Sequence, residues 1–145
     1  MEIYTIGFTQ KSAEQFFGIL NDNEIQRLLD VRISNNSQLA GFTKQTDLPF
    51  FLRELCGAEY VHEPRLAPTQ ELLKDYRDKR VTWAGYEVIF NNLLAEREIE
   101  QLLSPAFFDT RTVLLCSEAT ADQCHRRLVA EYLRDRWDDV CIVHL

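Results

Sequence analysis

The stretch TVLLCSEATADQCHRRLVAEYL, residues 112–133, joins an apolar run to an amphipathic segment through a short polar connection. An uncharged run that ends at Cys116 is typical of a strand buried on both faces of a parallel sheet. Thr120 and Gln123 have the spacing of a capping box, which predicts a helix over about 121–137. A buried strand followed directly by a helix is the repeating unit of an α/β fold.

Four further apolar runs lie on either side of this unit: EIYTIGF at 2–8, RLLDVR at 27–32, EYVH at 59–62 and VCIVHL at 140–145. They alternate with helical patterns, the first of which begins with a capping box formed by Ser12 and Gln15. EYVH is brief, as expected of an edge strand. The pattern predicts one α/β domain over 1–145, with a mainly parallel sheet of about five strands flanked by helices.

The connection over 63–111 is the longest between two predicted strands. A helix over about 47–56, ended by Gly57, precedes it, and helical patterns follow at 70–79 and 83–103. The last pattern places four large side chains at helical spacing: Trp83, Tyr86, Phe90 and Leu94. A connection of this length is unusual for a plain crossover. It therefore forms either a pair of packing helices, which is the simpler interpretation, or a lid over a site.

Composition places the chain among soluble globular proteins, with 145 residues of which 46% are hydrophobic and 27% charged. No segment approaches the roughly 20 apolar residues of a membrane span, and MEIYTIGF lacks a basic n-region. We therefore expect no membrane association, no signal peptide and a cytoplasmic location. The four cysteines form no CxxC pair, so we expect reduced thiols rather than disulfides.

Charge limits the partners, because 16 basic against 23 acidic side chains give a net charge of −7. This disfavours an extended nucleic-acid surface, which needs a basic stripe, but it allows a small positive pocket. No GxGxxG or GxxxxGK[ST] motif is present, and we expect no cofactor. SEATADQCHR after Cys116 is too long and too acidic for a rhodanese or tyrosine-phosphatase loop. The sequence does not indicate an oligomeric state.

Reactive side chains cluster at the predicted carboxyl ends of the strands, where parallel sheets bind ligands. The positions at or just after strand ends are Gly7, Asp30, Arg32, Cys116, Glu118 and His144. In the predicted last helix, His125 falls in the middle of the buried stripe set by Leu128, Val129, Tyr132 and Leu133. Cys124 and Arg126 flank that stripe, and Arg127 points toward solvent.

These residues suggest a nucleophilic site. Cys116 or Cys124 is the candidate nucleophile and His125 its base, with Glu118 or Asp30 orienting the imidazole. Gly7, Asp30, Arg32 and Arg126 are the candidate ligand-binding residues. Arg126 and the helix amides near Ala121 would hold an anion.

Structural roles are open for the same residues. The thiols can be packed as small hydrophobes, Asp30 and Arg32 can pair with each other, and Arg126 can pair with Glu118. A metal site is not expected, because adjacent ligands on a helix rarely reach one ion.

The chain resembles the domain-of-unknown-function 488 family (DUF488) of bacteria and archaea. The resemblance rests on these segments and residues: TIGFT at 5–9, LLDVR at 28–32, GFTKQTDLPFFLRELCGAEYVHEPRLAPT at 41–69, Trp83, Tyr86 and LLCSEATADQCHRRLVAEYL at 114–133. It implies a compact α/β fold and marks eight motif positions: Gly7, Asp30, Arg32, Cys116, Glu118, Cys124, His125 and Arg126. Phe8 stands where many relatives have histidine. The resemblance implies no reaction, substrate or cofactor.

Three functions remain open from sequence, and whether the protein is an enzyme is itself undecided. The first is a small cytosolic enzyme acting on an anionic ligand, such as a nucleotide or phosphorylated metabolite. The second is a non-catalytic module that binds a ligand or a protein. The third is nucleic-acid processing through the ISNNSQ loop at 33–38, which the acidic net charge disfavours.

Overall fold

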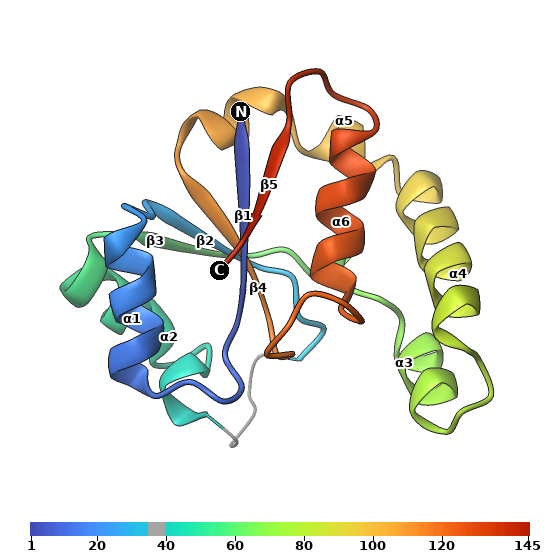
Figure 1. Ribbon diagram of the computed structural model, residues 1–145, viewed down its shortest axis with the longest axis horizontal. Coiled ribbons are helices and arrows are strands. Elements are labelled where there is room, and N and C mark those ends of the chain that lie inside the picture. The colour runs from blue at the N-terminus through green and yellow to red at the C-terminus, as the bar shows by residue number, and fades with distance from the viewer. Residues whose placement is uncertain (35–39) are drawn as a thin grey trace.

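A single parallel sheet organises the fold. In the computed structural model, which describes residues 1–34 and 40–145, five strands lie in the order β3-β2-β4-β1-β5 (Figure 1). Their bounds are β1 Glu2–Gly7, β2 Arg27–Asp30, β3 Glu59–His62, β4 Thr112–Cys116 and β5 Cys141–His144. Each neighbouring pair is parallel. The prediction of an α/β domain with a parallel sheet is confirmed, with β4 at the centre and β3 at an edge as expected.

Helices cover both faces of the sheet (Figure 1). On one face lie α1 (Ala13–Asp22) and α2 (Leu48–Phe51), which continues as a π-helix over Leu52–Cys56. The other face is covered by α3 (Gln70–Arg77), α4 (Trp83–Glu96), α5 (Ile99–Leu102) and α6 (His125–Arg134). Short 3-10 helices occupy Gly41–Thr43, Pro64–Leu66 and Pro105–Asp109.

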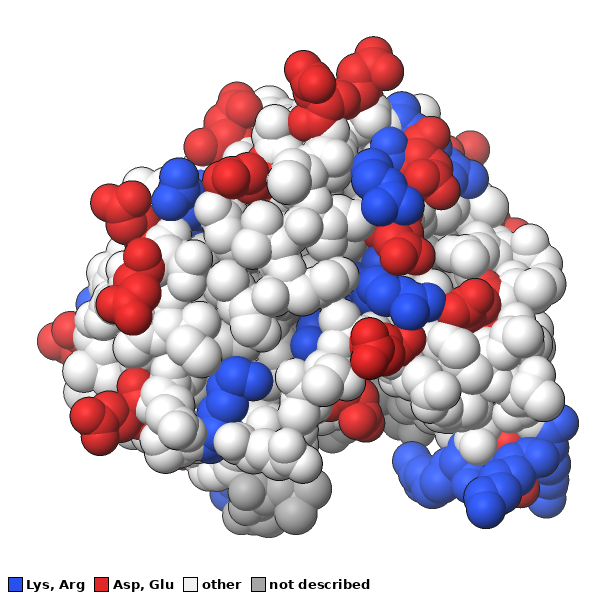
Figure 2. All heavy atoms as spheres, in the orientation of Figure 1, with Lys and Arg blue, Asp and Glu red and all other residues white. Residues whose placement is uncertain are grey.

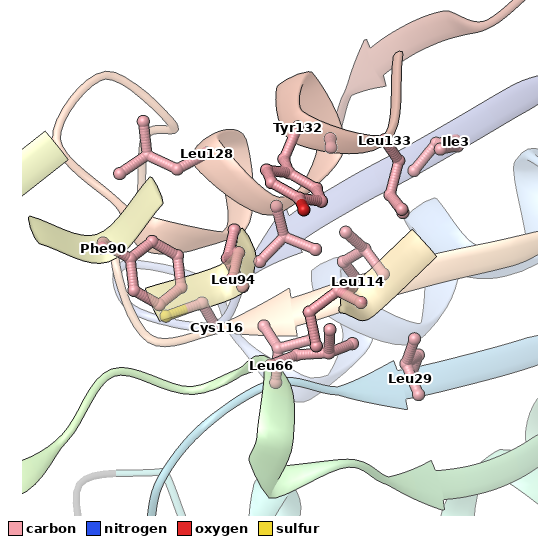
Figure 3. Packing of buried hydrophobic residues seen from close by; sticks show 14 of the residues in the cluster. Ile3, Leu29, Leu66, Phe90, Leu94, Leu114, Cys116, Leu128, Tyr132 and Leu133 are labelled. Carbon is pink, nitrogen blue, oxygen red and sulfur yellow. The ribbon is translucent and has the colours of Figure 1, made fainter. Parts of the chain in front are cut away.

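Strand β4 divides its side chains between two apolar cores, because successive residues of a strand point to opposite faces. Val113 and Leu115 pack on the α1 side, whereas Leu114 and Cys116 pack on the α4 and α6 side (Figure 3). All five residues of β4 are buried. This alternation directs the last side chain of the strand, the Cys116 thiol, toward the start of α6.

Two local predictions about helix ends are confirmed. Ser12 and Gln15 form a complete capping box at the start of α1. Gly57 adopts φ +61°, the left-handed conformation that glycine tolerates best, and ends the helix that precedes it. Helix α4 buries Tyr86, Phe90 and Leu94 of its predicted stripe, whereas Trp83 is half-buried.

The predicted helix over 121–137 is wrong at both ends, because α6 runs only from His125 to Arg134. Thr120 and Gln123 form no cap. The carbonyl groups of the connecting loop instead accept hydrogen bonds from arginine side chains. Arg126 Nη1 donates to the Glu118 carbonyl at 2.5 Å, and Arg127 Nη1 donates to the Asp122 carbonyl at 2.6 Å.

The predicted helix over 83–103 is also interrupted. Glu98 adopts φ +51°, which separates α4 from α5. The turn places Ile99 in the core, where it is fully buried. Burial of this apolar side chain favours the turn that ends α4. Across residues 1–34 and 40–145, no helix has both the length and the apolar character of a membrane span.

Candidate functional site

A cavity of about 390 Å³ opens at the carboxyl ends of the central strands, between the sheet and the α3–α4 pair. Its wall includes Phe8, Arg32, Ile33, Ser34, Leu73, Tyr76, Arg77, Trp83, Tyr86, Cys116, Ser117, Glu118, Gln123, Cys124 and His125. Five of the sequence-predicted site residues therefore share one cavity: Arg32, Cys116, Glu118, Cys124 and His125. Gly7, Asp30 and Arg126 lie close by but do not line it.

Cys116, Cys124 and His125 form the reactive part of the cavity wall, which we call the thiol–imidazole cluster. Their potential ligand atoms all lie within 4.8 Å of one another. Cys116 Sγ is 3.5 Å from His125 Nδ1. All three residues are buried, yet each contributes to the cavity surface.

The expectation that Cys124 and His125 could not converge on one point assumed that both lie within a helix, and that assumption is wrong. Cys124 is the residue before α6 and has φ −135° and ψ 138°, which is extended backbone. Consecutive side chains around an extended residue are not held at the helical angle of 100°. The change from extended to helical backbone between the two residues brings both side chains toward Cys116.

Hydrogen bonding orients the imidazole of His125. Nε2 lies 2.7 Å from the carbonyl oxygen of Val31, at the end of β2. A carbonyl only accepts, so Nε2 carries the proton that it donates. In the neutral ring, Nδ1 then has a free lone pair, and the Cys116 sulfur lies 3.5 Å from Nδ1 and 3.8 Å from Nε2. The ring also packs edge-on against Phe90, with ring centroids 5.7 Å apart.

The two thiols differ in acidity because they interact with each other. A hydrogen bond from Cys124 lowers the pKa of Cys116, and the backbone N–H groups of Ser117 and Glu118 together with the Arg126 charge act in the same direction. The same bond and burial raise the pKa of Cys124. Cys116 is therefore the more acidic of the two thiols.

Arg126 is nearly inaccessible, with 1% of its surface exposed. Its guanidinium donates to the Glu118 carbonyl, to Thr5 Oγ1 at 3.3 Å and to Cys124 Sγ at 3.7 Å. Within residues 1–34 and 40–145, it has no carboxylate partner, so the expected pairing with the Glu118 side chain is not present. The helix amides near Ala121 that were predicted to hold an anion together with Arg126 are not at that position, because α6 begins four residues later.

Gly7 allows the loop after β4 to approach β1. A Cβ atom at Gly7 would lie 1.5 Å from the Glu118 carbonyl oxygen and 2.7 Å from Arg126 Nη1. Non-bonded atoms cannot lie this close together, so a side chain at Gly7 would force the backbone of the loop to move. Because Gly7 has no side chain, the loop after β4 and Arg126 can pack directly against β1. Gly7 therefore affects the cavity indirectly, through the positions of that loop and of Arg126.

Asp30 and Arg32 form a buried pair with two short hydrogen bonds of 2.8 Å each. Tyr60 donates a third bond to Asp30, at 2.6 Å. Arg32 also donates to the Thr43 carbonyl at 2.7 Å, and its guanidinium lies over the ring of Phe8. The pairing of Asp30 with Arg32, which the sequence left open as a structural role, is therefore present. It holds the start of the loop after β2 beside the cavity.

The remaining sequence candidates occupy different surroundings. Glu118 is exposed, and His144 at the end of β5 bonds Thr5 rather than facing the cavity. Arg127 was expected to face solvent but is only half-exposed, because it pairs with Glu87 on α4 at 2.6 Å and lies over Trp83. Most of the 33–38 loop lies outside the described residues.

The sequence prediction did not include the α3–α4 wall of the cavity. Tyr76, Trp83 and Tyr86 pack against one another there, and Trp83 stacks on Tyr86 with centroids 4.9 Å apart. Arg77 is exposed and has no carboxylate partner in the described part of the chain. The basic residues of this segment are Lys74, Arg77, Lys79 and Arg80. Figure 2 shows a dense basic group at the lower right, over α3, beside a notch in the surface.

A basic run in an acidic chain was the sequence signal for this wall. The segment KDYRDKR at 74–80 carries four cations and two carboxylates, whereas the whole chain has a net charge of −7. Its position at the cavity depends on the packing of α3 against α4, which the helical periods alone do not give. The 63–111 connection is therefore a pair of packing helices that also forms one side of the cavity.

Comparison with known proteins gives one match. The family model described as "Domain of unknown function DUF488" matches residues 12–133 of the chain. No curated protein and no solved structure matches it. The matched segment includes every residue that lines the cavity except Phe8.

Proposed function

Because the chain belongs to the DUF488 family, whose description names no activity, we propose a function from the cavity itself. The protein is a small-molecule enzyme that binds an anionic ligand over the thiol–imidazole cluster. The observation that carries this proposal is the presence of Cys116, Cys124 and His125 on the wall of one cavity, with the imidazole held by Val31.

The cluster supports chemistry rather than packing alone. Three nucleophilic or metal-ligating groups converge within 4.8 Å and have access to a space large enough for a ligand. Pockets of about 300–1,000 Å³ with an apolar lining and a few converging polar groups are typical ligand sites. Thiols packed as ordinary hydrophobes would have apolar neighbours on all sides instead.

The rest of the cavity wall indicates the class of ligand. Tyr76, Trp83 and Tyr86 provide an aromatic surface for a flat, partly apolar group. Arg77 at the same wall offers an unpaired guanidinium, which binds phosphate or carboxylate through paired hydrogen bonds. A nucleoside monophosphate combines these two features, so this compound class is the first to test.

Thermal-shift measurements with four nucleoside monophosphates, the corresponding nucleosides, a hexose phosphate and inorganic phosphate test the proposal. We expect at least one nucleoside monophosphate to raise the melting temperature more than its nucleoside does. Incubation followed by chromatography then shows whether the bound compound is converted. Lack of any shift at millimolar concentration of all these probes would contradict the proposed ligand class.

The non-catalytic alternative gives a different outcome in the same experiment. Binding without conversion, even after long incubation, would favour a ligand-sensing module. Binding of short oligonucleotides that weakens steeply with salt would favour a nucleic-acid ligand. The basic residues near Arg77 are the described feature that such a ligand would contact.

A further inference from the structure

We infer that Cys116, Cys124 and His125 bind one zinc ion, whose fourth coordination position faces the cavity. This inference deepens the proposed function, because it assigns a metal to the reactive end of the same cavity. The metal site itself can be tested without knowing the ligand.

The spacing of the cluster fits tetrahedral zinc. With zinc–sulfur bonds of about 2.3 Å and zinc–nitrogen bonds of about 2.1 Å, a sulfur and a nitrogen ligand lie about 3.6 Å apart. Cys116 Sγ and His125 Nδ1 are 3.5 Å apart. Cys124 completes a set in which all three ligand atoms lie within 4.8 Å of one another. Thiolate and imidazole ligands in this geometry favour zinc over magnesium or calcium.

The orientation of His125 provides a second, independent argument. Histidine ligands usually donate their other ring N–H to a carboxylate or a backbone carbonyl, which fixes the ring and its tautomer. His125 makes such a bond from Nε2 to the Val31 carbonyl, at 2.7 Å. The remaining nitrogen, Nδ1, keeps its lone pair free for a metal and is the ring nitrogen nearer to Cys116 Sγ, at 3.5 Å against 3.8 Å for Nε2.

A charged donor beside the sulfur atoms completes the surroundings of a metal–thiolate site. The Arg126 guanidinium donates to the Cys124 sulfur at 3.7 Å. Two thiolates and a zinc ion are neutral together, so the buried Arg126 leaves one positive charge. An anion in the fourth position would balance that charge. The site thus favours hydroxide or the anionic group of the ligand.

Three protein ligands with an accessible fourth position are typical of catalytic rather than structural zinc. Cys116, Cys124 and His125 all line the cavity, so a water molecule can occupy that position. Zinc lowers the pKa of such a water to about 7. The resulting reaction is hydrolysis: the water oxygen bonds to the electrophilic atom, the leaving-group bond breaks, and the water proton passes to the leaving group. No oxidant or reductant is required.

The test uses untagged full-length protein kept reduced and stripped of metal, then titrated with zinc or cobalt(II). We expect one equivalent to bind, and the cobalt form to show the sulfur-to-metal charge-transfer band and visible bands of a tetrahedral thiolate site. Cys124→Ser should weaken zinc binding by at least about a hundredfold, the upper range for loss of a supporting partner. Cys56→Ser and Cys141→Ser are the matched controls, because neither residue lies in the cluster.

The intensity of the charge-transfer band in the unmodified protein gives a second readout, since it scales with the number of sulfur ligands. It remains informative if the Cys124 variant does not fold. Failure of the metal-free protein to bind cobalt, or equal loss in the control variants, would overturn the metal site. If cobalt does not bind but a nucleoside monophosphate still raises the melting temperature of the metal-free protein, the proposed ligand pocket stands while the zinc inference fails. If zinc binds but no such probe changes the melting temperature, the zinc inference stands while the proposed ligand class fails.

Discussion

The Nε2 atom of His125 lies 2.7 Å from the carbonyl oxygen of Val31, and this bond joins the first turn of α6 to the end of β2. The two residues are 94 positions apart in the chain. Their contact therefore forms only when the sheet and α6 are assembled. It holds the imidazole beside Cys116, with Nδ1 free, through folding rather than through local sequence.

The zinc inference predicts that His125→Gln separates metal binding from folding. The glutamine amide can still donate to the Val31 carbonyl but has no second nitrogen lone pair for a metal. We expect zinc affinity, measured by competition with a chromogenic chelator, to fall at least about a hundredfold. The free energy of unfolding of the metal-free protein should change by about 1–2 kcal/mol at most.

His62→Gln is the control for that variant. His62 also bonds a backbone carbonyl through Nε2, that of Arg32 at 2.9 Å, but it does not line the cavity. Its substitution should leave zinc affinity unchanged. Equal affinity in the His125 variant and the unmodified protein would remove His125 from the ligand set.

Arg77→Gln should selectively weaken the binding of phosphorylated ligands. The variant keeps a polar side chain but is shorter and loses the charge that would meet the phosphate, as does the Arg80 control below. Hydrogen bonds to charged groups contribute about 1.5–3 kcal/mol, so affinity for a nucleoside monophosphate should fall about tenfold or more. Calorimetry with the matched nucleoside should show no change. Arg80→Gln is the control, because Arg80 belongs to the same basic segment, is close to Asp75 and does not line the cavity.

Gly7→Ala should destabilise the protein by about 1–3 kcal/mol, as expected when a methyl group is forced into a packed region. The new Cβ would overlap the Glu118 carbonyl, and the loop would have to move away from β1. Gly18→Ala in α1 is the control, since nothing lies within 4 Å of its Cβ position. That change should stabilise the protein by roughly 0.5–1 kcal/mol. Urea denaturation measures both, and equal stability of the two variants would contradict the close approach at Gly7.

Asp30→Asn should lower the free energy of unfolding by about 3–5 kcal/mol, because it leaves the buried Arg32 cation without its partner. Glu54→Gln removes a carboxylate from the exposed pair with Arg53 and should change stability by less than about 1 kcal/mol. Urea denaturation of both variants gives the comparison. A small effect at Asp30 would mean that the pair is not the support of the loop after β2.

His144 predicts a pH dependence of stability. Burial, followed by the nearby Arg126 charge, lowers its pKa from the usual 6.5. Thr5 accepts from Arg126 and can direct its own hydroxyl proton to Nδ1 of His144, which must then be unprotonated. The unfolded chain takes up the proton more readily than the folded one. The stabilisation is thus fully present above pH 6.5 and is lost as the pH falls through the lower, folded-state value.

His144→Asn should remove this part of the pH dependence. The comparison is the difference in free energy of unfolding between the variant and the unmodified protein, measured above and below pH 6.5. That difference should shrink toward acidic pH. A difference that stays constant over this range would show that protonation of His144 is not linked to folding.

Much of the fold was predictable because its determinants are local. The uncharged run ending at Cys116 identified the central strand, and the brief EYVH run identified an edge strand. The two capping-box patterns show the limit of such reasoning. Ser12 and Gln15 form the box, but Thr120 and Gln123 do not, because α6 begins only at His125 and both residues lie in the loop before it, whose carbonyl groups accept from Arg126 and Arg127. Those bonds depend on contacts with distant parts of the chain.

The candidate site was predictable in part for a similar reason. The end of β4 and the buried stripe of α6 were enough to bring Cys116 and His125 together. The position of Cys124 was not, since it depends on extended backbone just before the helix. The burial of Arg126 and the placement of Arg77 at the cavity both follow from the packing of whole elements. Periodicity and motif spacing carry no information about either.

The cavity is built from two parts of the chain with different constraints. The thiol–imidazole cluster comes from the end of β4, the first residue of α6 and the residue before it, whereas the aromatic and basic wall comes from the excursion between β3 and β4. Changes in α3 or in the first turns of α4 can therefore alter what the protein recognises without disturbing the groups that would react. Under the proposed function, exchanging this excursion between family members would change the compound that is bound while leaving the thiol–imidazole cluster in place.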